Sequence, residues 1–158
     1  MSFAVLRLRG KGDLRHDVKD TLRMLHLTRQ NHCAIVPQDA TYRGMLQLVK
    51  DYVTWGEVDP EVLAKILLKR GRQIGDRPID DAFVKSHSRY KSIWDFSQAL
   101  AKGEARIAEV RELRPMIRLP PPRKGYRGIK RGYHDGGDLG YRGKAINELL
   151  ARMVLEEP

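Results

Sequence analysis

The stretch HCAIVPQDATYRGMLQLVKDYVTWGE, residues 32–57, places a short apolar run, a helical pattern and an alternating run in direct succession. The apolar run is partly β-branched and ends at a proline, which is typical of a buried strand. Asp39 suits a helix N-cap, and Leu46 and Val49 lie on one helix face, so we expect a helix over 40–50. The alternating run that closes the stretch predicts a second strand. The stretch is therefore predicted to fold as strand, helix and strand.

The residues before this stretch repeat the same pattern. FAVLRLRG, residues 3–10, alternates apolar and basic residues, as a half-buried strand does. Asp13 is a plausible N-cap for a helix in which Val18 and Leu22 recur at helical spacing. Together, residues 3–57 predict the element order β-α-β-α-β.

The residues after this stretch predict more helix and one more strand. Residues 59–71 form a well-marked helix, with Pro60 at its first position and Gly71 just past its end. The remaining elements that we expect are helices from Asp80 and from Ser92, a strand over 116–119 and a closing helix over 143–157.

The chain divides into four expected parts. They are a compact α+β core over 1–57, a helical extension over 58–112, a basic proline- and glycine-rich arm over 113–143, and a C-terminal helix over 144–158.

The net charge points to a polyanionic partner. The 30 Lys and Arg residues exceed the 20 Asp and Glu residues, which gives a net charge of +10. Nucleic acid is the first candidate and an anionic membrane surface the second. No apolar run approaches the length that spans a bilayer. Of the two candidates we expect nucleic acid as the partner and no membrane. A single cysteine excludes an intramolecular disulfide and fits a reducing cytosol.

The excess charge is concentrated in residues 113–144, which hold nine Lys or Arg residues and two Asp residues. Tyr126, Tyr133 and Tyr141 are interleaved among these cations. Cations neutralise phosphates and tyrosines offer stacking faces, so we expect contact with RNA or DNA. Because a helix follows the segment, the arm is tethered at both ends. This favours a loop that becomes ordered on its partner.

The sequence offers little for catalysis or metal binding. Gly143-Lys144 resembles the end of a phosphate-binding loop, but Asp138 and Ala145 stand where that motif needs Gly and Ser or Thr. Cys33 and His32 are strand neighbours that point to opposite faces, and the five histidines lack metal-ligand spacing. We therefore expect no enzyme activity, no cofactor and no metal site.

Several segments together resemble a known family. AVLRLRG (4–10), TLRMLHLTRQNHCAIVP (21–37) and DATYRGMLQLVKDYVTWGE (39–57) are similar to the core of the large-subunit ribosomal protein family L-thirty. LRPMIRLPPPRKGY (113–126) and GGDLG (136–140) resemble landmarks of its longer, archaeal-type form.

The resemblance implies an α+β fold with a ferredoxin-like β-α-β-α-β core, in which a three-stranded antiparallel sheet has its helices on one face. A helical and extended-loop C-terminal extension follows that core. The implied function is that of a structural constituent of the large ribosomal subunit, which binds and stabilises large-subunit ribosomal RNA without catalysis. The implied location is the ribosome in the cytoplasm. The implied partners are this RNA, neighbouring ribosomal proteins and, as a further candidate neighbour, the small RNA of the same subunit.

The candidate RNA-binding residues follow from the pattern of cations and tyrosines and from the family resemblance. We expect that Gly44 allows RNA to approach its helix closely; the alternative is that it relieves packing against the sheet. Leu48 departs from the family, because many members have a lysine there, and no RNA contact is implied at that position. The candidates are Arg7, Arg9, Lys11, Arg43, Gly44, Arg118, Arg123, Lys124, Tyr126, Arg127, Lys130, Arg131, Tyr133, His134 and Arg142.

Two other classes of protein compete with this interpretation. A DNA-binding module of a small basic cytosolic protein would need a recognition helix, for which the basic helix face at Arg15, Lys19 and Arg23 is a weak candidate. A metabolic enzyme of ferredoxin-like fold would need an active site, and the residues offer none.

Overall fold

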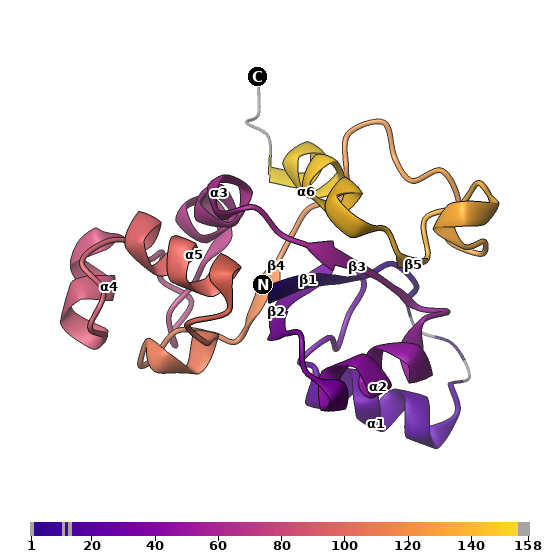
Figure 1. Ribbon diagram of the computed structural model, residues 1–158, viewed down its shortest axis with the longest axis horizontal. Coiled ribbons are helices and arrows are strands. Elements are labelled where there is room, and N and C mark those ends of the chain that lie inside the picture. Colours follow the sequence, from indigo (N-terminus) through magenta and orange to yellow (C-terminus); the bar gives the residue numbers. More distant parts are fainter. Residues whose placement is uncertain (1, 11, 13, 155–158) are drawn as a thin grey trace.

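The computed structural model describes residues 2–10, 12 and 14–154, which form a mixed α+β fold (Figure 1). In that part of the chain, five strands join in one sheet and six α-helices pack around it. The strands are β1 (Ser2–Arg7), β2 (His32–Pro37), β3 (Val53–Glu57), β4 (Met116–Arg118) and β5 (Gly140–Tyr141). The helices are α1 (His16–Met24), α2 (Ala40–Val49), α3 (Pro60–Arg70), α4 (Asp81–His87), α5 (Ile93–Lys102) and α6 (Ile146–Val154). None of the described helices has the length and apolarity of a membrane span.

The three strands predicted within residues 3–57 are confirmed and form the middle of the sheet. β1 lies at the centre, with β2 and β3 antiparallel to it on either side. Val5 of β1 is in register with Ala34 on one side and Trp55 on the other. The order β-α-β-α-β predicted for this region is therefore the observed one.

The expectation of a three-stranded sheet is wrong, because the C-terminal part adds a strand at each edge. β4 pairs antiparallel with β2, where Cys33 faces Ile117. β5 pairs parallel with β3, where Thr54 faces Gly140. In a three-stranded sheet the outer edges of β2 and β3 would leave main-chain donors and acceptors unpaired. The chain satisfies part of both edges with its own C-terminal residues.

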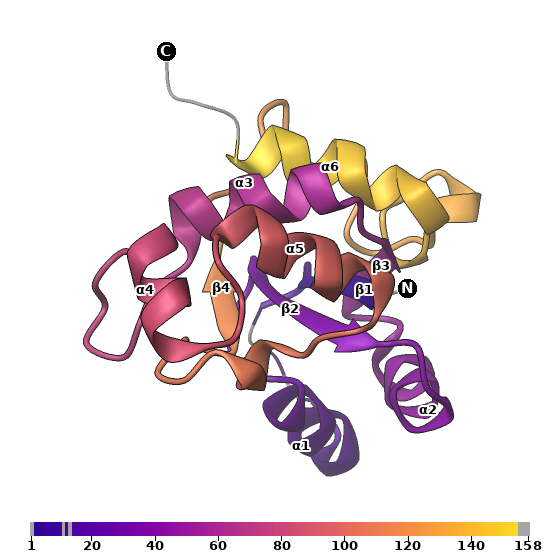
Figure 2. The same cartoon turned by 60° about the vertical axis from the view of Figure 1, so that its left-hand side comes forward.

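One face of the sheet is covered by α1 and α2, which lie together below the sheet in Figure 2. Phe3 and Val5 from β1 pack there with apolar residues of both helices. The predicted N-cap of α2 is confirmed, since Asp39 Oδ1 accepts a hydrogen bond from the Tyr42 main-chain N–H at 2.9 Å. Asp13, the predicted N-cap of the first helix, lies outside the described residues, and α1 begins at His16.

The opposite face of the sheet is covered by the extension. Ala4, Leu6 and Leu8 form one apolar cluster with buried residues of α3, α5 and α6. These three helices lie above the sheet in Figure 2. The expectation that helices cover only one face of the sheet therefore holds for α1 and α2 but not for the whole described chain. The extension buries the second apolar face of the sheet.

The start of α6 is docked tightly against β3. A Cβ atom added at Gly56 would lie only 1.8 Å from the carbonyl oxygen of Gly143. Such an approach is possible only because Gly56 has no side chain. The sequence of β3 is thus adapted to the C-terminal part of the chain.

Candidate nucleic-acid interface

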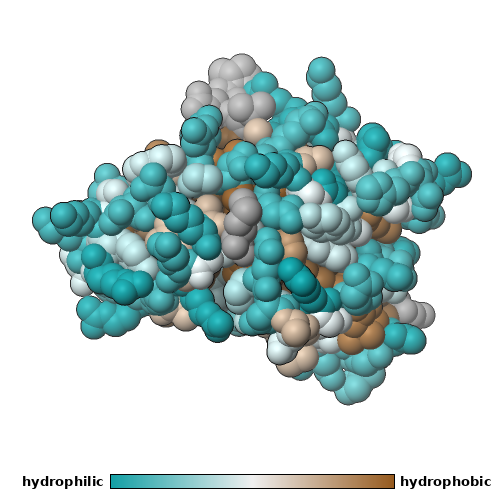
Figure 3. All heavy atoms as spheres, viewed as in Figure 1, coloured by the Kyte–Doolittle hydropathy of each residue, from teal (hydrophilic) through white to brown (hydrophobic). Residues whose placement is uncertain are grey.

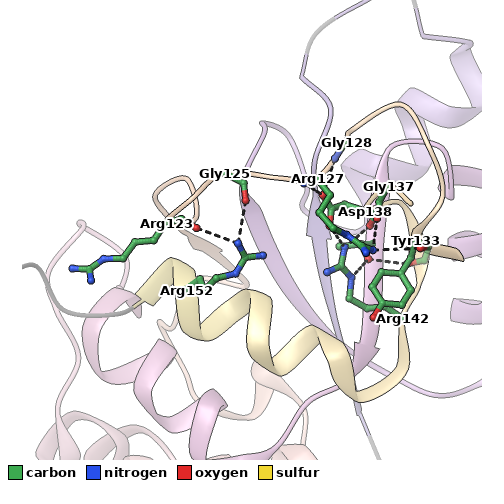
Figure 4. Close-up of polar contacts among 11 residues, drawn as sticks. Arg123, Gly125, Arg127, Gly128, Tyr133, Gly137, Asp138, Arg142 and Arg152 are labelled. Atoms are coloured by element: carbon green, nitrogen blue, oxygen red, sulfur yellow. Dashed lines mark hydrogen bonds and ion pairs between the residues drawn. The ribbon is translucent and has the colours of Figure 1, made fainter. Parts of the chain in front are cut away.

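Residues 119–143, here called the basic loop, run from β4 to the start of α6 and contain β5 (Figure 1). Two charged residues of this loop are almost fully buried: the Asp138 side chain is 1% exposed and that of Arg142 is 4% exposed. Arg142 Nη2 donates to Asp138 Oδ1 at 2.9 Å, and Arg142 Nε donates to Thr54 Oγ1 of β3 at 2.8 Å. The pair joins the loop to the sheet (Figure 4).

Asp138 also fixes the opposite side of the loop. Its Oδ2 accepts hydrogen bonds from the main-chain N–H groups of Arg127 and Gly128, the second at 3.0 Å. Arg127 Nη2 donates to the Gly137 carbonyl at 2.6 Å (Figure 4). The guanidinium groups of Arg127 and Arg142 each lie 4.8 Å from the centroid of the Tyr133 ring, which is a favourable cation–π distance. Asp138 therefore acts as the centre around which the loop closes.

Burial and charge act in opposite directions on Arg142. Burial lowers the pKa of Arg142 from its ordinary value, whereas the hydrogen bond to Asp138 raises it. Arginine remains charged at every physiological pH. The buried contact is consequently an ion pair.

A second set of contacts fixes the first half of the loop. Arg152 of α6 donates from Nη1 to the carbonyl oxygens of Arg123 and Gly125, both at 3.1 Å (Figure 4). The Tyr126 hydroxyl donates to Asn31 Oδ1 beside β2, and burial raises the Tyr126 pKa well above its ordinary range. The sequence favoured a loop that becomes ordered on its partner, whereas these polar contacts link much of the loop to other parts of the chain itself.

The same contacts leave a group of cations at the surface. Six predicted site residues of the loop are exposed, and they are spread along a backbone that is fixed at several points. The face of the molecule in Figure 3 is mostly hydrophilic, with small separate apolar areas. Cations on a fixed backbone suit phosphate groups, because the cost of ordering the loop is met before binding. Five of the six are the cations Arg123, Lys124, Arg127, Lys130 and Arg131, and the sixth is His134.

The predicted basic patch at the end of β1 has mostly internal contacts. Arg7 is 5% exposed, and its Nη1 donates to the Leu27 carbonyl at 2.8 Å. Burial lowers the pKa of Arg7. Arg9 is partly exposed, with its guanidinium 5.0 Å from the centroid of the Tyr52 ring. Lys11 lies outside the described residues.

Arg43 and Gly44 are both exposed on α2. A Cβ atom added at Gly44 would meet no neighbouring element within 4 Å among the described residues. The alternative that Gly44 relieves packing against the sheet is therefore wrong. Glycine weakens a helix interior by roughly 0.5–1 kcal/mol relative to alanine, so its use here has no structural benefit within the described chain.

Arg118 lies at the other edge of the sheet, on β4. It is exposed and forms an ion pair with Asp76 at 3.6 Å. Its neighbour across the strands is His32, which is 7% exposed. Burial lowers the pKa of His32, and the positive charges of Arg118, Arg29 and Arg7 lower it further. Three arginines therefore contribute positive charge near His32 at this edge.

The structure offers no assembled catalytic or metal centre within the described residues. They contain no cluster of three or more His, Cys, Asp or Glu side chains suited to a metal ion. Cys33 is fully buried, and burial raises its pKa to about 12, so the thiol stays protonated. What the surface presents instead is positive charge with a few aromatic rings.

The sequence identified exposed cations of this surface but not the residues that hold the basic loop in position. Asp138, Arg152 and Asn31 position the loop, and none of them was among the candidates. The only sequence signal for Asp138 was the segment GGDLG, in which it lies among glycines and an apolar residue.

The family model and the relatives that match this chain point to the same family. Residues 3–53 match the family model described as ribosomal protein L30p/L7e. Proteins named large ribosomal subunit protein uL30 are similar to nearly the whole chain. That of Methanopyrus kandleri is 49% identical over 93% of this chain and 100% of its own length. Those of Methanocorpusculum labreanum and Methanoregula boonei are 49% and 51% identical, each over 96% of this chain and 99% of their own length. The chain therefore belongs to the L30p/L7e family of ribosomal proteins.

Proposed function

We propose that this protein is a structural constituent of the large ribosomal subunit and that it binds and stabilises large-subunit ribosomal RNA without catalysis. The observation that carries the proposal is identity of about half the residues, over nearly the full length, with proteins named as components of that subunit. Its location is accordingly the ribosome in the cytoplasm. Its partners are the RNA and neighbouring ribosomal proteins, with the small RNA of the subunit a further candidate neighbour.

The basic loop is the principal RNA-binding element in this proposal. Its exposed cations each neutralise a phosphate and release counterions, which makes affinity depend steeply on salt. A loop already closed around Asp138 loses little conformational entropy on binding. Arg9, Arg43 and Arg118 add phosphate contacts outside the loop.

Three of the candidate residues act indirectly. Arg142 donates hydrogen bonds to Asp138 and Thr54. Arg7 donates to the Leu27 carbonyl, and Tyr126 donates to Asn31. Each group is directed toward the chain's own atoms. We assign them the task of keeping the neighbouring cations in place. Tyr133 both positions cations and contacts RNA, because the residue is partly exposed and its ring lies 4.8 Å from the guanidinium groups of Arg127 and Arg142.

The four-part division of the chain is also a proposal. Residues 1–57 are a ferredoxin-like core, residues 58–112 a helical extension, residues 113–143 the RNA-binding arm, and residues 144–158 a C-terminal helix. What supports the division is that α1 and α2 share one apolar cluster with the sheet, while α3, α5 and α6 share the other.

A competition experiment tests the proposal against the DNA-binding alternative. The labelled protein is bound to a large-subunit ribosomal RNA transcript and challenged with unlabelled RNA or with duplex DNA of equal phosphate content. We expect the RNA to displace the protein at far lower concentration. Equal displacement by duplex DNA would contradict the proposal.

A further inference from the structure

A groove of about 310 Å³ lies between α2 and the edge of the sheet formed by β3 and β5. Three aromatic side chains contribute to its wall: Phe3, Trp55 and Tyr141. Tyr141 is 43% exposed, although its ring centroid lies 6.1 Å from that of Phe3 and 6.3 Å from that of Trp55. The two neighbouring rings meet it at 71° and 48°, so neither is stacked parallel on it.

The Tyr141 ring is held in place. Its hydroxyl donates to Glu57 Oε1 at 2.5 Å, and this hydrogen bond raises the pKa of Tyr141. Its main chain belongs to β5, where Tyr141 is in register with Trp55. A fixed, neutral aromatic ring at a surface is a platform for stacking that costs little entropy to use.

The rim of the groove supplies groups that suit a nucleotide. Arg43 offers a guanidinium for a phosphate, and the neighbouring Gly44 leaves the surface of α2 open to close approach. Gln47 and Glu57 also line the groove. An amide and a carboxylate can accept hydrogen bonds from the amino group of a base, and a carboxylate oxygen retains acceptor capacity after one bond.

We propose that this groove takes one unpaired nucleotide of RNA, with its base stacked on Tyr141 and its phosphate bound by Arg43. The carboxylate of Glu57 favours a base with an exocyclic amino group over uracil, which has none. The inference rests on the proposed function and adds a site that reads a base to a surface that otherwise contacts phosphates. A protein side chain is the weaker candidate, because it explains neither the cation at Arg43 nor the open helix surface at Gly44.

Substitution of the stacking ring tests the site. In Tyr141→Leu the ring is lost, and we expect RNA affinity to fall by about five- to 100-fold, as for one stacked base. Tyr141→Phe keeps the ring and should bind within about twofold of the unchanged protein. Neither change alters charge, so the dependence of affinity on salt should stay the same. Equal binding by Tyr141→Leu and the unchanged protein would overturn the inference and leave the proposed function standing.

A cross-linking experiment identifies the occupant in a chain that keeps Tyr141. A photoreactive benzophenone amino acid replaces Gln47, and the protein is incorporated into large subunits before irradiation. The matched control has the same group in place of Trp94, an exposed residue of α5. We expect an RNA adduct from the first protein, at an unpaired A, G or C. An adduct to a protein, or no adduct, would overturn the inference, while failure of the unchanged protein to bind any ribosomal RNA would overturn the proposed function as well.

Discussion

Arg142 and Asp138 form a buried ion pair, with Arg142 Nη2 donating to Asp138 Oδ1 at 2.9 Å. Both residues lie in the basic loop, which holds six Lys or Arg residues and two Asp residues. Arg142 also donates to Thr54 of β3, and Asp138 also accepts from the main-chain N–H groups of Arg127 and Gly128. A single carboxylate therefore determines where several of the loop's cations project.

The first prediction concerns the stability that this carboxylate provides. Asp138→Ala leaves Arg142 buried without its partner, and such a loss costs about 3–5 kcal/mol. Urea denaturation should show this decrease in the free energy of unfolding. Asp135→Ala, which removes an exposed carboxylate of the same loop, should change stability by less than about 0.5 kcal/mol. A loss of similar size in both variants would show that the buried pair has no special role.

The second prediction concerns the cations of the basic loop. Replacing Lys124, Lys130 and Arg131 by glutamine should lower RNA affinity and reduce the slope of log affinity against log salt by about three units. The matched control replaces Lys85, Lys91 and Lys102 by glutamine, which removes the same charge from exposed positions on the helical extension. Filter binding across a range of salt concentrations measures both slopes. If the two triple variants behave alike, net charge rather than the loop determines binding.

The third prediction separates binding from stability at Gly44. Because a Cβ atom there meets no neighbouring element among the described residues, Gly44→Ala should stabilise the protein by about 0.4–1 kcal/mol. The added methyl group should at the same time weaken RNA binding, because we propose that RNA approaches α2 at this position. Thermal unfolding and filter binding on one preparation measure the two effects. A stabilised variant with unchanged affinity would mean that RNA does not reach this surface.

The fourth prediction uses His32 as a probe of the β4 edge. Burial and three arginines lower the His32 pKa below its ordinary value of 6.5. The folded state therefore binds this proton less readily than the unfolded state, and the stability that His32 contributes above pH 6.5 is lost as the pH falls below that value. His32→Gln should make the pH dependence of unfolding shallower in this window.

RNA binding should raise the His32 pKa. A phosphate that pairs with Arg118 or Arg29 weakens the positive field, so the His32 pKa should rise when RNA is bound. NMR titration of the His32 ring with and without RNA measures the change. An unaltered titration would place the RNA away from this edge.

The sequence predicts the middle of the sheet because its patterns are local. Alternation over residues 3–10 and the capping residue Asp39 each depend on neighbours within a few positions. The element order β-α-β-α-β and the strand at Met116–Arg118 follow from such patterns. β5 is different, because two residues that pair with β3 across more than eighty positions leave no periodic signal.

The candidate site was predictable in composition but not in geometry. Charge and tyrosines identified the basic loop, whereas the burial of Asp138 and Arg142 depends on a pairing with Thr54 that no spacing reveals. Arg7 was a candidate RNA-binding residue, yet its guanidinium donates a hydrogen bond to the Leu27 carbonyl beyond α1. Long-range hydrogen bonds decide which cations are available to RNA, and a sequence pattern does not contain them.

Sedimentation of the native lysate tests the central claim most directly. The protein, detected by an antibody, is followed through a sucrose gradient that separates ribosomal subunits. We predict that it migrates with the large subunit at low salt and is released as salt is raised, because phosphate contacts of exposed cations weaken with salt. Migration at the top of the gradient at low salt, or with the small subunit, would contradict the account.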